Sequence, residues 1–181
     1  MGTVFLLVFG RAQVFRAVAC AVLLGSVVGC AGSVAPPVVA MALPKAERAN
    51  LHVDKVSTEA AAGVALTTVD TDRITQLVIA DLNVVAPGML DPAAAGAKSV
   101  RIVVTRYDEG SAAARFMLAG VGQIRLDGTV RVVDRASGRT IGEYRVEKQF
   151  AFGGLYGGLT SIQDVEAGFA KSIAALLRSE P

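Results

Sequence analysis

The sequence predicts an α+β domain of two layers, in which two helices cover one face of a mostly antiparallel sheet. Three observations predict it: apolar and polar residues alternate over 124–134, alternate again over 140–150, and recur at helical spacing in two other segments. The predicted order is β-α-β-β-β-α within one domain at residues 50–181. Half-apolar helices and a half-apolar sheet bury their apolar faces against each other, which gives the two layers.

The first strand and the first helix are expected in the N-terminal half of this domain. Residues 51–55 alternate between apolar and polar, as a short strand does. A helix is expected over 71–86, because residues 70–72 supply a cap and acids for its first turn. Pro87 and Gly88 end it. Its apolar residues follow at helical spacing: Ile74, Leu77, Val78, Leu82 and Val85.

Three strands are expected next. The first contains Val100, Ile102 and Val104 and ends near Tyr107. The second is 124–134, with one apolar and one charged face. A hairpin turn at 134–138, where Gly138 suits a left-handed φ, leads into the return strand at 140–150. On that strand the apolar side chains Tyr144, Val146 and Phe150 point inward, and Glu143, Arg145 and Glu147 point outward.

The last helix follows a glycine-rich loop at 153–158. Thr160 or Ser161 is expected to cap the helix, with Gln163 or Asp164 in the capping-box position. The loop resembles a phosphate-binding loop in spacing, but Leu159 stands where that loop needs a lysine, so nucleotide binding is not expected. The apolar stripe of the helix consists of Ile162, Val165, Phe169, Ile173, Leu176 and Leu177.

The N-terminus has the features of a lipoprotein signal peptide at residues 1–29. A positive region precedes an apolar stretch at 17–24 and a small-residue cleavage region. Residues 27–30, Val-Val-Gly-Cys, resemble a lipobox, which implies cleavage before Cys30 and attachment of fatty acids such as palmitate there. Because residues 4–9 are apolar ahead of the first arginine, the true start is placed near residue 14. The alternative is a transmembrane helix at 17–35, which its glycines and Pro36-Pro37 disfavour.

Residues 30–49 are expected to form the lipid anchor and a flexible tether, since they contain prolines and no clean period. No aspartate follows Cys30, which by analogy with Gram-negative sorting indicates the outer membrane, with the domain facing the periplasm.

Charge and cysteine content exclude several classes of protein. Residues 1–29 hold two arginines and no acid, so the mature chain has 18 − 2 = 16 basic and 16 acidic residues. A neutral surface argues against nucleic-acid binding. Cys20 and Cys30 both lie in or at the end of the N-terminal segment, which excludes a disulfide framework and thiolate zinc sites. With His52 as the only histidine, neither a metal nor another cofactor is expected.

Residues 110–158 contain a set of turn and strand residues that together form a recognisable pattern. The features are Gly110-Ser111, Arg115, the small residues 119–122, the strand into 132–134, Ser137-Gly138 and the glycine-rich loop. With these features the stretch resembles an uncharacterised family of bacterial lipoproteins, the domain-of-unknown-function family 4410. The resemblance implies an envelope location and this fold, and it implies no activity.

The sequence therefore favours a membrane-anchored, non-enzymatic module of the cell envelope that binds a protein partner or a second copy of itself. No pattern in it singles out catalytic residues. Leu155 and Tyr156, at the tip of the glycine-rich loop, are the candidate partner contacts. Arg115 lies in an otherwise apolar or small stretch. There it is expected to pair with a nearby acid or to cap backbone carbonyls, and the alternative is that it clamps a carboxylate ligand. The alternative function is a periplasmic lipoprotein that carries a small ligand.

Overall fold

A computed structural model describes residues 33–178 of the chain. The predicted signal peptide, residues 1–29, and the predicted lipidation site, Cys30, lie outside the described residues. The strands are β1 (Ser33–Val34), β2 (Val38–Met41), β3 (Val53–Ala60), β4 (Lys98–Asp108), β5 (Ile124–Asp134) and β6 (Thr140–Phe150). The helices are α2 (Lys45–Ala49), α3 (Thr68–Val85), α4 (Ala112–Met117), α5 (Gly154–Leu159) and α6 (Ile162–Arg178).

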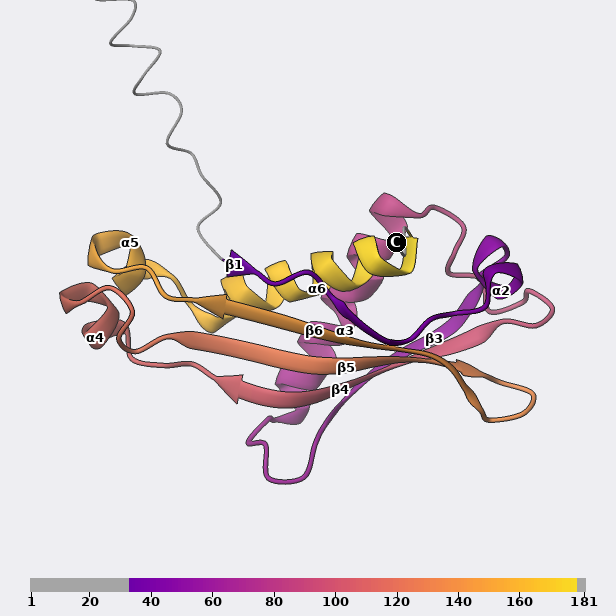
Figure 1. Ribbon diagram of the computed structural model, residues 1–181, viewed down its shortest axis with the longest axis horizontal. Coiled ribbons are helices and arrows are strands. Elements are labelled where there is room, and N and C mark those ends of the chain that lie inside the picture. Colours follow the sequence, from indigo (N-terminus) through magenta and orange to yellow (C-terminus); the bar gives the residue numbers. More distant parts are fainter. Residues whose placement is uncertain (1–32, 179–181) are drawn as a thin grey trace, which may run out of the picture. The chain divides into compact units, whose positions relative to one another are not determined.

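The strands form one sheet in the order β1-β6-β5-β4-β3, and β2 also pairs with β6 (Figure 1). Every pairing is antiparallel except that of β3 with β4. The crossover between these two parallel strands contains α3, as a parallel connection requires. The predicted α+β fold class, with a mostly antiparallel sheet, is confirmed.

The core lies between the sheet and the two long helices, α3 and α6. The inward residues of β4 and β5 are buried, and so is the predicted apolar stripe of α6. At Gly128 the sheet and α6 approach closely, because a Cβ there would lie 2.8 Å from Cζ of Phe169. No helix among residues 33–178 is both long and apolar enough to cross a membrane.

The caps of the two long helices follow from side-chain chemistry. Helix α3 begins three residues earlier than expected, because the Thr67 side chain accepts from the backbone N–H of Asp70 and the Asp70 carboxylate accepts from that of Thr67. Asp70 is thus the third residue of the helix and the acidic partner in a capping box, and Thr67 is the cap itself. For α6 the Asp164 carboxylate accepts from the backbone N–H of Ser161, as the predicted capping box requires.

Residues 33–49 differ from the flexible tether that the sequence predicts. Strands β1 and β2 pair with β6, and α2 follows. Leu43 is buried, and its backbone N–H donates to the Tyr144 hydroxyl over 3.0 Å. Glu47 of α2 lies 3.0 Å from Lys98 Nζ. These contacts come from residues far away in the sequence, so the local composition of this segment does not reveal them.

Two short helices were also not expected from the sequence. Residues 153–158, predicted as a loop, contribute most of α5, and α4 lies in the stretch around Arg115. Each helix has six residues, which is too short for a clear helical period. Ser111 caps α4 by accepting from the backbone N–H of Ala114.

Candidate functional site

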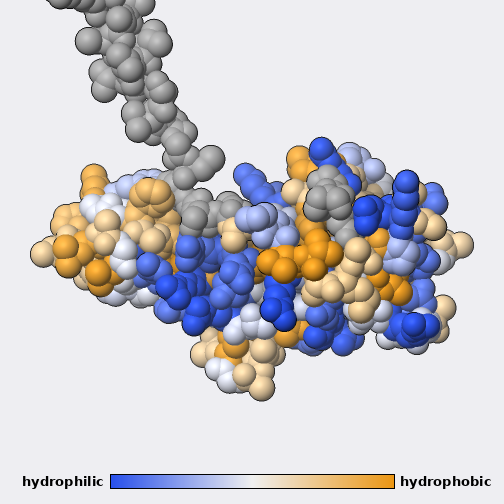
Figure 2. Space-filling model, in the orientation of Figure 1, coloured by the Kyte–Doolittle hydropathy of each residue, from blue (hydrophilic) through white to orange (hydrophobic). Residues whose placement is uncertain are grey.

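The two short helices pack against each other and form an apolar end of the domain. Eight large apolar side chains there are between 47% and 74% exposed, whereas exposed apolar residues on a protein surface are ordinarily scattered singly. Figure 2 shows this end as a nearly continuous hydrophobic area. We call it the end surface, and it consists of Phe116, Met117, Leu118, Val121, Phe152, Leu155, Tyr156 and Leu159.

The end surface carries no exposed charge. Arg115 is the only charged residue within residues 110–123 and 151–163, and it is 2% exposed. Its guanidinium donates to four backbone carbonyls, those of Glu109 (3.1 Å), Gly122 (2.7 Å), Gly157 (2.9 Å) and Thr160 (2.9 Å). Arg115 therefore joins the two segments of the end surface from within. With its donors used on the protein's own backbone, it is not placed to clamp a ligand.

Glycines let the two segments approach each other. A Cβ on Gly153 would lie 2.6 Å from the backbone nitrogen of Ala119, and one on Gly157 would lie 2.2 Å from the carbonyl oxygen of Phe152. Both distances are too short for any side chain. The glycine-rich sequence thus serves close packing of backbone on backbone.

The structure places both candidate contact residues on the end surface. Leu155 is 68% and Tyr156 is 58% exposed, and the Tyr156 ring lies 5.6 Å from that of Phe150. Sequence reasoning missed Phe116, Met117 and Leu118, which come from a segment that is distant along the chain. A signal was available, because residues 151–163 hold no charged residue and residues 110–123 hold only Arg115.

A second unpartnered surface is the outer edge of β2. Its four residues are all exposed, including Val38 at 56% and Met41 at 47%. On its inner side β2 pairs with β6, and within residues 33–178 no further strand pairs with its outer side. The strand has no charged residue and no proline.

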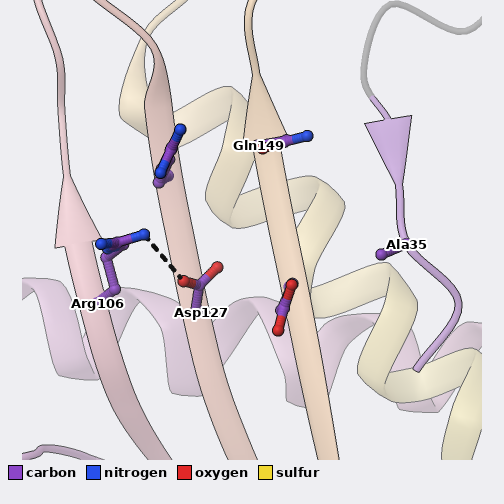
Figure 3. A pocket seen from close by; sticks show the side chains of 6 residues that line it. Ala35, Arg106, Asp127 and Gln149 are labelled. Atoms are coloured by element: carbon purple, nitrogen blue, oxygen red, sulfur yellow. Dashed lines mark ion pairs between the residues drawn. The ribbon is translucent and has the colours of Figure 1, made fainter. Parts of the chain in front are cut away.

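The face of the sheet opposite the helices is polar. It holds a hollow of about 160 Å³ where Arg106 lies 3.8 Å from Asp127, beside Glu147 (Figure 3). Burial, followed by the neighbouring charge of Glu147, raises the pKa of Asp127. The hollow is open and lined by charged side chains, unlike the largely apolar cavity that a small-ligand carrier needs.

An ionic cluster lies at the junction of β4, α3 and α6. The fully buried Glu166 accepts from Arg73 and from the Tyr107 hydroxyl, and Arg73 also pairs with Asp70 at 2.6 Å. The hydrogen bond to Glu166 raises the pKa of Arg73. Every charged group of the cluster has a partner, as buried charges require. In the described part of the chain no group of three or more His, Cys, Asp or Glu residues is arranged to hold a metal ion.

Comparison with known proteins identifies the family. The family model described as Domain of unknown function (DUF4410) matches residues 46–154, more than half of the chain. The chain belongs to this family, which confirms the resemblance seen in the sequence. No curated protein matches it.

Several solved structures are similar to the chain at low identity. A PelC dodecamer from Paraburkholderia phytofirmans is 13% identical, with a TM-score of 0.49 over 82% of this chain and 100% of its own. A PelC variant from the same organism, also a dodecamer, is 14% identical, with a TM-score of 0.47 over 83% and 99%. A protein from Caulobacter crescentus CB15, provisionally assigned as a lipoprotein, is 17% identical, with a TM-score of 0.36 over 68% and 84%.

Proposed function

We propose that the chain is a bacterial lipoprotein of the cell envelope, anchored in the outer membrane by fatty acids on Cys30, and that it binds a protein partner without catalysing a reaction. The lipobox-like residues 27–30 and the signal-peptide pattern before them support the anchor. Several acyl chains on one residue give stable attachment, whereas one chain gives marginal attachment. By analogy with Gram-negative sorting, the Ala-Gly that follows Cys30 in place of an aspartate supports the outer membrane.

The observation that supports protein binding is the uncovered outer edge of β2. An edge strand offers a row of backbone N–H and C=O groups, and proteins usually protect such a strand with charges or proline. Residues 38–41, Val-Val-Ala-Met, contain neither. A strand from a partner can add to this edge, with backbone hydrogen bonds for affinity and the exposed Val38 and Met41 for apolar contact.

Fatty-acid labelling tests the anchor. In cells fed a radiolabelled or alkyne fatty acid, the wild-type chain is expected to carry the label and to sediment with outer membranes. Cys30→Ser is expected to lose both properties. Cys20→Ser is the matched control and should keep both. A Cys30→Ser chain that stays in the membrane without label contradicts the lipid anchor and favours a transmembrane segment.

Site-specific cross-linking tests the edge strand. A photoreactive residue at position 39 is expected to give a protein adduct in intact envelopes. Val38→Lys introduces a charge on this edge and should abolish the adduct. Val84→Lys, at an exposed valine on α3, serves as the control and should leave the adduct unchanged. The protein-binding proposal is wrong if the adduct survives Val38→Lys or never forms.

A further inference from the structure

The end surface lies beside the point where the lipid anchor joins the domain. Strand β1 pairs Ser33 with Gln149, at the C-terminal end of β6 from which the chain continues to α5 (Figure 1). The next residue is Phe150, whose ring centroid lies 5.6 Å from those of Phe152 and Tyr156. The N-terminal segment thus enters the domain next to the base of the end surface.

Cys30 is only three residues before Ser33 in the sequence. Because an extended residue spans at most about 3.6 Å, the two Cα atoms are at most about 11 Å apart. A lipid on Cys30 therefore holds this end of the domain close to the bilayer. A protein partner that covered the end surface would have to fit between the domain and the membrane.

The chemistry of the end surface suits lipid. Its exposed side chains are aliphatic or aromatic, and its single arginine is turned inward onto backbone carbonyls. Protein interfaces usually surround an apolar centre with a polar rim that forms hydrogen bonds. Here the uncharged stretch extends through all of residues 110–123 and 151–163 apart from Arg115. Exposed apolar residues at this density mark an interaction surface, and the adjacent anchor identifies the occupant.

We infer that the end surface is a membrane-docking face, which inserts Leu155, Tyr156, Leu159 and the exposed residues of α4 into the boundary between lipid headgroups and acyl chains. The inference rests on the proposed lipidation of Cys30. Leu155 and Tyr156, predicted from the sequence to be partner contacts, then contact lipid. The domain is held at two points, so that β2 and the polar sheet face project into the periplasm.

Photo-cross-linking of the full-length chain in native membranes tests this inference. A diazirine-bearing aliphatic residue replaces Leu155 in one variant and Val84 in the other. Both sites are exposed, at 68% and 77%, but Val84 lies near the end of α3 that adjoins the start of β3, away from α4 and α5. We expect mass spectrometry to find phospholipid adducts at position 155 and none at position 84. Protein adducts at 155, or equal lipid adducts at both sites, would overturn the inference.

Two further measurements make the result specific. Fatty-acid labelling at Cys30 is read in parallel. A labelled chain without lipid adducts at 155 overturns the docking face and leaves the anchor intact, whereas an unlabelled chain overturns the anchor itself. In the second measurement the photoreactive probe replaces Met117, and the same chain also carries the two substitutions Leu155→Asp and Leu159→Asp. Both substituted side chains are exposed, so the fold is expected to be preserved, and circular dichroism checks this. The lipid adduct at position 117 is expected to be lost. Its persistence at full yield counts against a shared docking face.

Discussion

Glu166 and Arg73 form an ion pair through two hydrogen bonds, with Nε 2.6 Å from Oε2 and Nη2 2.8 Å from Oε1. Glu166 is fully buried, whereas the Arg73 side chain is 30% exposed, so water reaches only one partner. The pair joins α3 to α6 on the inner side of the sheet. If Arg73 is removed, the carboxylate stays in the core with the Tyr107 hydroxyl as its remaining donor.

Arg73→Met is therefore expected to destabilise the fold. Breaking a buried pair from one side costs about 3–5 kcal/mol, and because Arg73 is partly exposed the expected loss is about 3 kcal/mol. Urea unfolding of the purified chain measures it. Arg101→Met, at an exposed arginine of β4, is the control and should change the free energy of unfolding little. An equal loss of unfolding free energy in Arg73→Met and Arg101→Met would contradict a special role for the pair of Arg73 and Glu166.

Tyr107 is expected to make the domain sensitive to alkaline pH. Burial, and then its hydrogen bond to Glu166, raises the pKa of the Tyr107 phenol above the ordinary value of 10.0. The unfolded chain thus releases this proton at a lower pH than the folded chain. The stabilisation is fully present below pH 10.0 and is lost as the pH rises from there through the folded-state pKa.

Comparison with Tyr107→Phe isolates this effect from the other groups that titrate at high pH. The free energy of unfolding is measured for both proteins between about pH 8 and pH 11. The wild-type value is expected to fall more steeply above pH 10. Parallel profiles would show that Tyr107 has the same pKa in both states.

Arg115 is expected to control the rigidity of the end surface. Arg115→Met removes the four hydrogen bonds to Glu109, Gly122, Gly157 and Thr160 and leaves several buried carbonyls unsatisfied. A loss of about 3 kcal/mol is expected, since hydrogen bonds to a charged group contribute about 1.5–3 kcal/mol each and water replaces some of them. Amide hydrogen exchange should quicken in residues 110–123 and 151–161.

The control for Arg115 is Arg125→Met, because Arg125 lies near the same end but its guanidinium donates, within residues 33–178, to the side chain of Gln123 alone. It should leave exchange in both segments unchanged. If amide hydrogen exchange in these segments quickened equally in both variants, the loss of any arginine near this end would account for it, and the four hydrogen bonds of Arg115 would have no special role.

The strands that were predicted best are those whose local pattern is sufficient to define them. The observed bounds of β5 and β6 equal the predicted ones, because strict alternation sets each strand and the hairpin turn at Gly138 sets their register. The start of α3 was missed because Thr67 and Asp70 exchange hydrogen bonds, and either residue alone resembles a cap. Strands β1 and β2 were missed because their structure depends on β6 and on the contact of Leu43 with Tyr144.

The end surface was predictable only in part, for a similar reason. The glycine-rich run marked Leu155 and Tyr156 as exposed apolar residues. Nothing local to that run indicates that residues 116–121 lie beside it. Their adjacency depends on Arg115, which reaches a carbonyl 42 residues further along the chain. A single charged residue inside a long uncharged stretch is the pattern that indicates such an inward-facing link.

Gly128→Ala tests how closely α6 packs on the sheet. In an ordinary strand, alanine is more stable than glycine by about 0.5–1 kcal/mol, because glycine loses more backbone freedom on folding. At this position the new methyl group would lie 2.8 Å from Cζ of Phe169 and 3.2 Å from the carbonyl oxygen of Val103. Phe169 is fully buried and cannot move outward, so overpacking by about 1–3 kcal/mol outweighs the gain and the variant is expected to be less stable.

Phe169→Leu distinguishes a steric cause from a backbone cause. Alone, it removes part of a buried ring and is expected to destabilise the fold through the cavity it leaves. Combined with Gly128→Ala, it gives the methyl group space, so the double variant should be more stable than the sum of the two single losses predicts. Urea unfolding of all four proteins measures this coupling. If the losses in free energy of unfolding are strictly additive, the backbone of β5 requires the glycine. If the double variant is more stable than their sum predicts, the close packing of α6 requires it.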